Sequence, residues 1–249
     1  MLHTRTRLFG LLAMVGLAFL STTHAATISG FSPDRGGPGT EVTLTGTGLQ
    51  TTMFVYFGST EASGEILFRS ANSVRARVPP TALTGQLSVF TSGSGSASSL
   101  GIFVTTPRIE SFTPLSGAPG TLVTLSGVNV GPGQFGSRGN VTGVRFNGQP
   151  AQFEIAGINQ LLALVPTNAT TGPITLINEA GSSSSQLSFH VAPLISSLSS
   201  TNGMPGDPIE IRGANLGTAL RVEFGFERAE FSVTSPSNLV ARVPTNAVN

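Results

Sequence analysis

Few side chains in this sequence could carry out chemistry. The 249 residues include no cysteine and only three histidines, two of which, His3 and His24, lie in the N-terminal segment. The third, His190, follows Phe189 near the end of an expected strand. A general base needs a nucleophile or a carboxylate placed to work with it, and the sequence places none beside His190. We therefore expect His190 to be an edge or linker residue and the protein not to be an enzyme.

The acidic residues do not have the spacing of a metal site. Asp34 and Asp207, the only aspartates, lie in turn regions just before or within a Pro-Gly element. An aspartate in a turn usually caps its own backbone, and we expect this role for both. No run of acids or histidines matches a calcium loop or a zinc site. The sequence thus predicts neither a metal nor a cofactor.

The segment Gly131–Gly136 fits the pattern G-x-G-x-x-G, which is typical of dinucleotide-binding loops. That pattern holds a pyrophosphate only where a strand leads into a helix. Pro132 and the surrounding glycine, serine and arginine residues predict no helix, so we do not interpret the segment as a nucleotide site.

The same segment begins a long loop. It runs from 131 to 143, whereas the corresponding loop earlier in the chain covers only 50–54. Long loops at the end of a β domain often carry binding residues. Phe135 and Arg138 are the candidate anchors for a partner, because aromatic and arginine side chains dominate contact energies. The alternative is a tolerated insertion without a role, and the sequence leaves both interpretations open.

Composition and charge exclude several partners. Charged residues make up 10% of the chain, every basic residue is an arginine, and the formal net charge is +1. Such a chain gives no electrostatic reason to bind nucleic acid or anionic lipid. We expect its partner to be a protein or a cell surface.

The first 25 residues have the plan of a secretory signal peptide. Arg5 and Arg7 precede an uncharged apolar run, Leu8 to Leu20, and small residues follow it up to Ala25. The run is shorter than the roughly 20 residues that cross a bilayer, although an uncleaved anchor is the alternative. We expect signal peptide 1–25, a mature chain without a membrane span, and an exported protein of bacterial origin in the periplasm, at the cell surface or outside the cell.

The rest of the chain repeats itself three times. Segments 28–33, 109–114 and 195–200 correspond, and they begin 81 and 86 residues apart. Each is followed by a Pro-Gly turn, an alternating strand such as Val42-x-Leu44, and a Gly-x-Asn/Gly kink. Further alternating strands follow, and no stretch has a helical apolar period. The spacing predicts all-β, antiparallel, immunoglobulin-like sandwiches at 26–106, 107–192 and 193–249, joined by short proline-containing linkers that favour a semi-rigid rod.

The ordered motifs resemble the IPT/TIG module of plexins and transcription factors. They are Ile-x-x-Phe-Ser/Thr-Pro, Pro-Gly-Thr, Gly-x-Asn/Gly, Val-x-Phe, Val-Pro and Thr-Gly, and they cover about residues 26 to 249. The third copy departs from the pattern, with Ser200 in place of the prolines Pro33 and Pro114. The resemblance implies an immunoglobulin-like fold without a shared active site, and in secreted bacterial members a spacer or binding role.

The third copy stops early. Only five residues follow Pro244, where the earlier copies continue with two more strands. We expect either that the sequence is a fragment of a longer product or that another chain supplies the strands by strand addition.

Two functions agree with these features of the sequence. The first is a non-catalytic secreted or cell-envelope protein that uses its tandem units as a spacer and as a protein-binding or adhesion surface. The alternative is a carbohydrate-binding accessory region of a larger secreted enzyme or receptor. Against the second stands a chain without tryptophan and with Tyr56 as its only tyrosine, since stacking surfaces for sugars are then scarce.

Overall fold

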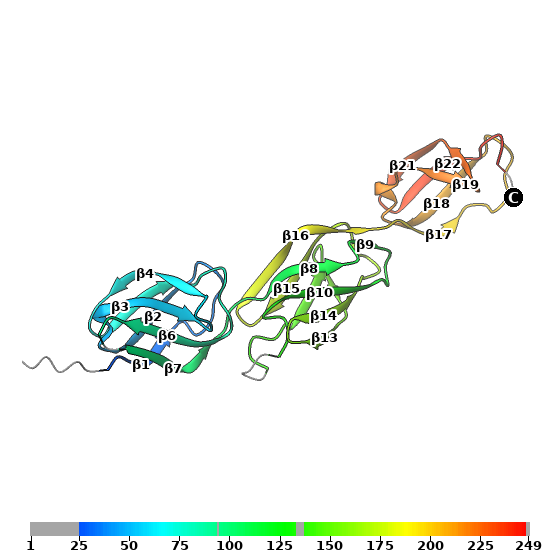
Figure 1. The fold of residues 1–249 in the computed structure, drawn as a ribbon. Helices are drawn as coiled ribbons and strands as arrows, with labels where there is room; N and C mark the ends of the chain where they lie inside the picture. Colours follow the sequence, from blue (N-terminus) through cyan, green and yellow to red (C-terminus); the bar gives the residue numbers. More distant parts are fainter. Residues whose placement is uncertain (1–24, 94, 133–136, 248–249) are drawn as a thin grey trace, which may run out of the picture.

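The structure is a computed structural model that describes residues 25–93, 95–132 and 137–247. Within these ranges the chain is built of β-strands, with two single 3-10 turns and no α-helix, and it forms three lobes in a row (Figure 1). The expected all-β architecture is confirmed. No helix in the described ranges is long and apolar enough to cross a bilayer. The expected signal peptide falls outside the described residues, apart from Ala25.

Unit 1, the expected range 26–106, wraps one antiparallel sheet around its core. The strands follow the order β1-β2-β5-β4-β3-β6-β7, so that β4 links the two faces of the sandwich. The core contains fifteen buried apolar residues, among them Val55 and Phe57 of the expected Val-x-Phe strand. Its elements are β1 (Thr27–Ser32), β2 (Glu41–Thr47), η1 (Leu49–Thr51), β3 (Thr52–Phe57), β4 (Ser63–Arg69), β5 (Ser73–Arg77), β6 (Gly85–Thr91) and β7 (Gly95–Phe103).

Unit 2, the expected range 107–192, has two separate sheets, β13-β14-β10-β8 and β12-β11-β15-β16-β9. They enclose a second core of fifteen buried residues, among them Val144 and Phe146. All pairs are antiparallel except β16 with the short β9. The strands are β8 (Arg108–Thr113), β9 (Ser116–Gly117), β10 (Leu122–Val128), β11 (Gly143–Phe146), β12 (Gln149–Ala151), β13 (Phe153–Gly157), β14 (Gln160–Leu164), β15 (Gly172–Asn178) and β16 (Gly181–Val191).

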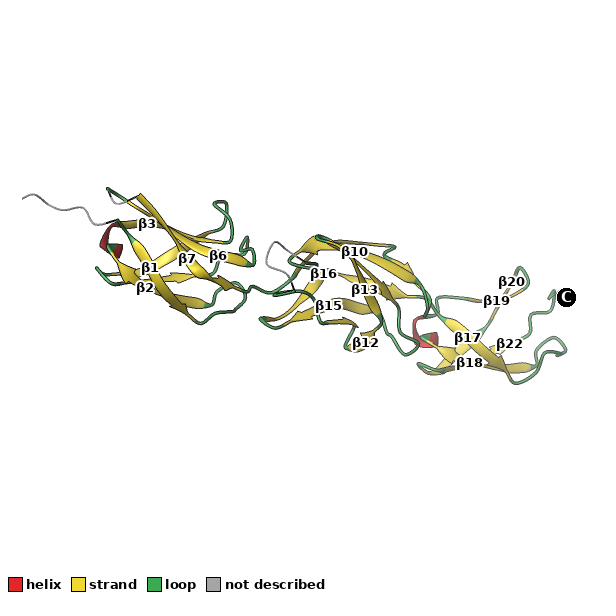
Figure 2. Cartoon of the chain, turned by 90° about the horizontal axis from the view of Figure 1, so that it is seen from below, coloured by secondary structure: helices red, strands yellow, loops and turns green. Residues whose placement is uncertain are grey.

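Unit 3, the expected range 193–249, has a smaller core. Five residues are buried in it, and its second sheet consists of β19 and β20 alone within the described residues (Figure 2). The first sheet, β17-β18-β22-β21, matches its counterpart in unit 2. The elements are β17 (Leu194–Leu198), β18 (Pro208–Ala214), η2 (Leu216–Thr218), β19 (Val222–Phe224), β20 (Glu227–Ala229), β21 (Phe231–Ser235) and β22 (Asn238–Arg242).

The Gly-x-Asn/Gly kink has one physical cause in all three units. At its first position the strand bulges against its neighbour so closely that a Cβ on Gly127 would lie 2.0 Å from the carbonyl oxygen of Arg108. At its last position the backbone is left-handed, which glycine and asparagine tolerate best. The φ values there are 68° at Gly48 and 57° at both Asn129 and Asn215.

Candidate functional site

Arg138, one of the two candidate anchors, lies at the joint between units 1 and 2. Its guanidinium is 3.4 Å from Asp34 of unit 1 and 3.5 Å from Glu179 of its own unit. Arg35 completes the group, at 3.0 Å from Asp34 and 3.1 Å from Glu179. The four side chains thus form a closed ring of alternating charge, with two members from each unit. Phe135, the other candidate anchor, lies outside the described residues.

The ring explains the electrostatics of the joint. The hydrogen bond from Arg35 lowers the pKa of the Asp34 carboxyl below its ordinary value, and Arg138 adds to this. The same bond raises the pKa of Arg35. All four side chains are substantially exposed, so each pair contributes little by itself and the arrangement is sensitive to salt. The expectation that Asp34 caps its own turn is wrong, because neighbouring guanidinium groups bind its carboxylate.

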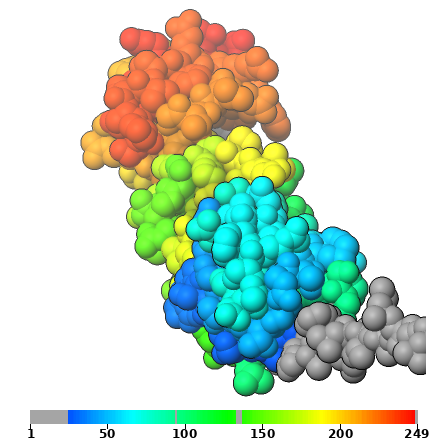
Figure 3. All heavy atoms as spheres, turned by 90° about the vertical axis from the view of Figure 1, so that its left-hand side faces the viewer, coloured from blue at the N-terminus to red at the C-terminus, as the bar shows by residue number. Residues whose placement is uncertain are grey.

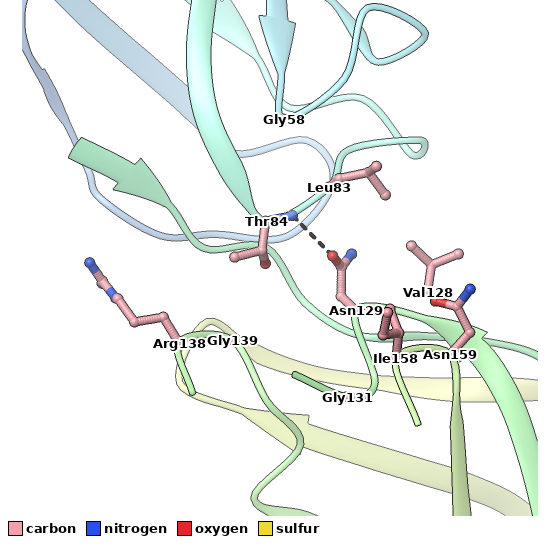
Figure 4. A pocket seen from close by; sticks show the side chains of 10 residues that line it. All are labelled: Gly58, Leu83, Thr84, Val128, Asn129, Gly131, Arg138, Gly139, Ile158 and Asn159. Carbon is pink, nitrogen blue, oxygen red and sulfur yellow. Dashed lines mark hydrogen bonds between the residues drawn. The ribbon is translucent and has the colours of Figure 1, made fainter. Parts of the chain in front are cut away.

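A second contact joins the units through the kink of unit 2. Asn129 accepts a hydrogen bond from the amide of Thr84 at 2.9 Å (Figure 4). Its side-chain amide donates to the carbonyl of Ala82 at 3.3 Å. The left-handed backbone at Asn129 directs this side chain away from unit 2 and onto the β5–β6 loop of unit 1. We call this contact the Asn129 clamp. Arg108 adds a hydrogen bond of 2.7 Å to the carbonyl of Pro80.

The linker between the two units is itself held in place. Asn178, which is 5% exposed, donates to the carbonyl of Thr105 in the linker at 2.9 Å and to the carbonyl of Gly139 at the same distance. The amide of Thr105 donates in turn to the hydroxyl of Thr84 at 3.2 Å. A buried amide with its polar atoms paired favours one geometry, because any other leaves it unsatisfied. These contacts fix the linker backbone.

A hollow of about 280 Å³ lies beside the Asn129 clamp (Figure 4). It is smaller than the roughly 300 to 1,000 Å³ typical of small-molecule sites. Among its described lining residues are amides, a hydroxyl and one guanidinium, but no carboxylate or histidine. The lining residues are Gly58, Leu83, Thr84, Val128, Asn129, Gly131, Arg138, Gly139, Ile158 and Asn159.

The other residues considered for chemistry lie apart from one another. His190 is exposed on β16, where its amide donates to the carbonyl of Leu115 at 3.0 Å. Asp207 accepts a hydrogen bond of 2.8 Å from the amide of Met204, which confirms the expected turn cap. Across the described part of the chain, no three histidine or acidic side chains come together as a metal site would require.

The structure also has exposed aromatic rings that were not predicted from the sequence. Phe54 and Phe90 are 41% and 42% exposed, and they lie on neighbouring strands of unit 1 beside Tyr56. The signal was present in the sequence. Because Val55 and Phe57 alternate into the core, their neighbours on the same strand must point outward.

The chain belongs to the IPT/TIG domain family. The family model matches residues 26–104 and 107–191, which cover units 1 and 2 and well over half of the chain. This agrees with the resemblance of the motifs and with the antiparallel sheets of the structure. A search of curated proteins found no match.

The chain is also similar to several solved structures. The plexin A4 extracellular region is 18% identical, with 95% of this chain and 22% of that chain covered and a TM-score of 0.32. The surface glycan-binding protein of Prevotella bryantii is 16% identical, with 57% and 37% covered and a TM-score of 0.31. A protein of a xyloglucan utilization locus in Bacteroides uniformis is 11% identical, with 76% and 66% covered and a TM-score of 0.30. The chain spans less than two thirds of each, and identities this low transfer no activity.

Proposed function

We propose that the protein is a non-catalytic, exported binding protein, at the cell envelope or secreted, in which IPT/TIG units act as a stiff spacer that presents a binding surface. The observation that carries this proposal is the Asn129 clamp, together with the charge ring beside it. They add direct contacts between the two units to the stiffness of the short proline-containing linker. In Figure 3 the units follow one another from unit 1 in front to unit 3 behind.

The proposal includes the domain ranges and two partner assignments. The unit boundaries stay at 106 and 192, after a signal peptide at 1–25. The small second sheet of unit 3 is the place where we expect strand addition, since β19 pairs with β20 alone among the described strands. The carbohydrate-binding alternative is favoured over protein adhesion by the exposed rings of Phe54 and Phe90 beside the partly buried Tyr56.

The spacer role is tested by measuring the distance between units 1 and 2. The chain has no cysteine, so cysteines placed at the exposed positions Thr60 and Ser188 carry the only two spin labels. We expect one narrow distance distribution. Asn129→Gly should broaden it, because glycine keeps the left-handed backbone but cannot make the clamp.

The matched control is Asn215→Gly, the same substitution at the same kink in unit 3. It should leave the distribution between units 1 and 2 unchanged. A broad distribution in the unsubstituted chain would contradict the spacer role, and so would a width that Asn129→Gly does not alter.

A further inference from the structure

The outer face of β3 and β6 in unit 1 carries three aromatic rings, of which Phe54 and Phe90 are exposed and Tyr56 is partly buried. Phe54 lies opposite Phe90 across the strand pair, and Tyr56 follows two residues along β3 on the same side. The ring centroids of Phe54 and Tyr56 are 5.8 Å apart with an angle of 15° between the planes, and those of Phe54 and Phe90 are 6.4 Å apart. We call these three side chains the aromatic face. Contiguous exposed aromatic rings of this kind mark binding surfaces.

The fold does not require these rings. In unit 2 the core residues Val144 and Phe146 correspond to Val55 and Phe57 of unit 1, and all four are buried. The strand residues beside them in unit 2 are Gly143 and Arg145, and Ile177 takes the place of Phe90. A sandwich of this family therefore forms with no ring at any of the three positions. Of units 1 and 2, only unit 1 has an aromatic face.

The surroundings of the aromatic face are neutral and rich in hydroxyl groups. Tyr56 is paired with Ser63 on β4 and with Ser88 on β6. The hydroxyls of Ser88 and Ser98 are 2.9 Å apart on the next strand pair. No carboxylate or guanidinium occupies the outward positions of β3 and β6. Such a face complements an uncharged ligand that has apolar patches and many hydroxyls, and the guanidinium of Arg69 in the adjoining groove already donates to the carbonyl of Thr52.

A groove extends the aromatic face. β4 pairs with β3 only at Ser63 and Gly64 and then crosses to β5, which leaves the start of β3 without a neighbour on that side. The opening has a volume of about 590 Å³ and is lined by Met53, Phe54 and Phe68 among others. The guanidinium of Arg69 in its wall donates to the carbonyl of Thr52. The face and the groove together provide room for an extended chain ligand.

We propose that the aromatic face binds a segment of a neutral polysaccharide. The C–H groups on the face of a sugar ring carry slight positive charge and pack against the negative face of an aromatic ring. The sugar hydroxyls meet the serine hydroxyls beside Tyr56, and the polymer continues into the groove next to Phe68. This inference rests on the proposed binding role and names its ligand class.

The test is affinity electrophoresis of the purified chain in native gels that contain soluble mixed-linkage β-glucan, xyloglucan, galactomannan or polygalacturonate. We expect retardation by at least one of the three neutral polymers and none by the charged polygalacturonate. Phe54→Ser and Phe90→Ser should each weaken the retarding interaction about five- to tenfold, as expected for the loss of an aromatic contact. The double variant should run as it does in an empty gel.

The matched control is Phe226→Ser, which removes a ring that is 94% exposed in unit 3, and it should keep full retardation. Equal thermal unfolding midpoints for Phe54→Ser and the unsubstituted chain show that the variant is folded. Retardation by no neutral polymer overturns the proposal, as does retardation that neither Phe54→Ser nor Phe90→Ser weakens. Self-association in light scattering that Phe54→Ser abolishes, without any polymer binding, makes the face a protein interface and also overturns it. The spin-label distances are independent of each of these results.

Discussion

At the scale of single residues, the joint between units 1 and 2 depends on pairs of opposite charge that lie far apart in the sequence. Arg138, a candidate anchor for a partner, contacts Asp34, which is 104 positions away and belongs to another unit of the same chain. Periodicity reports which face of a strand a residue occupies, and it contains no information about how two units dock. The charge ring could therefore not be predicted, whereas the cap at Asp207 is local and could be.

The charge ring makes the joint sensitive to acid. The pKa of Asp34 in the folded protein is below the ordinary 3.8, so its carboxylate stabilises the folded state fully above that value. The stabilisation is lost as the pH falls through the lower folded-state pKa. We expect the unfolding midpoint of the unsubstituted chain to fall more steeply below pH 3.8 than that of Asp34→Asn, in thermal scans from about pH 5 to about pH 2.

High salt provides the control for this prediction. Screening weakens the ring, so the difference between the two proteins should shrink at about 1 M salt, where the Debye length is about 3 Å. Identical pH profiles at low salt would show that Asp34 contributes nothing to stability.

The aromatic face shows what composition leaves out. The absence of tryptophan and the single tyrosine pointed away from sugars, and phenylalanine was not considered as a stacking surface. Phe57 is indeed in the core, fully buried, but Phe54 on the same strand is on the outside. Alternation along the strand distinguishes the two, and a count of residue types does not.

At the scale of secondary structure elements, the repeated motifs predicted the strands that carry them. β2, β10 and β18 follow the Pro-Gly turns, and β5, β14 and β22 end just before Val-Pro. The short strands β12 and β20 were not predicted, since neither has a motif of its own. The crossing of β4 between the two faces of unit 1 was also missed, because strand pairing depends on contacts far along the chain.

The kink glycine should be the least tolerant position of its strand. Gly127→Ala would place a methyl group 2.0 Å from the carbonyl oxygen of Arg108. Because this oxygen belongs to the backbone, it cannot move aside as the end of a flexible side chain could. We expect a loss of about 2 to 3 kcal/mol in the free energy of unfolding of unit 2, measured by urea denaturation.

Gly157→Ala is the matched control in the same unit. Nothing lies within 4 Å of an added Cβ there, so its stability should stay within about 0.5 kcal/mol of the unsubstituted chain. Equal effects of the two substitutions would contradict the close approach at the bulge.

At the scale of the whole molecule, the three units differ in how well their cores are covered. The cores of units 1 and 2 each bury fifteen apolar residues, and that of unit 3 buries five. Asn215 occupies the same kink position as Asn129, yet its buried side-chain nitrogen has no hydrogen-bond acceptor among the described residues. Unit 3 therefore has fewer stabilising contacts in its core than units 1 and 2, and fewer at its kink than unit 2.

Hydrogen exchange of the intact chain should resolve this difference. Amides of β18 and β22 pair with each other as those of β10 and β14 do, but they cover a smaller core. We expect them to exchange faster, because local opening exposes less apolar surface. Equal protection of the two strand pairs would show that the small core is sufficient for a stable unit.

The restriction of the aromatic face to unit 1 also sets the valency of the chain. A chain in which every unit carried such rings could bind one polymer at several points at once, and this multivalency would raise its avidity. If the aromatic face binds a polymer as proposed, units 1 and 2 offer one point of attachment within the described residues, and firm binding would depend on several copies of the chain side by side.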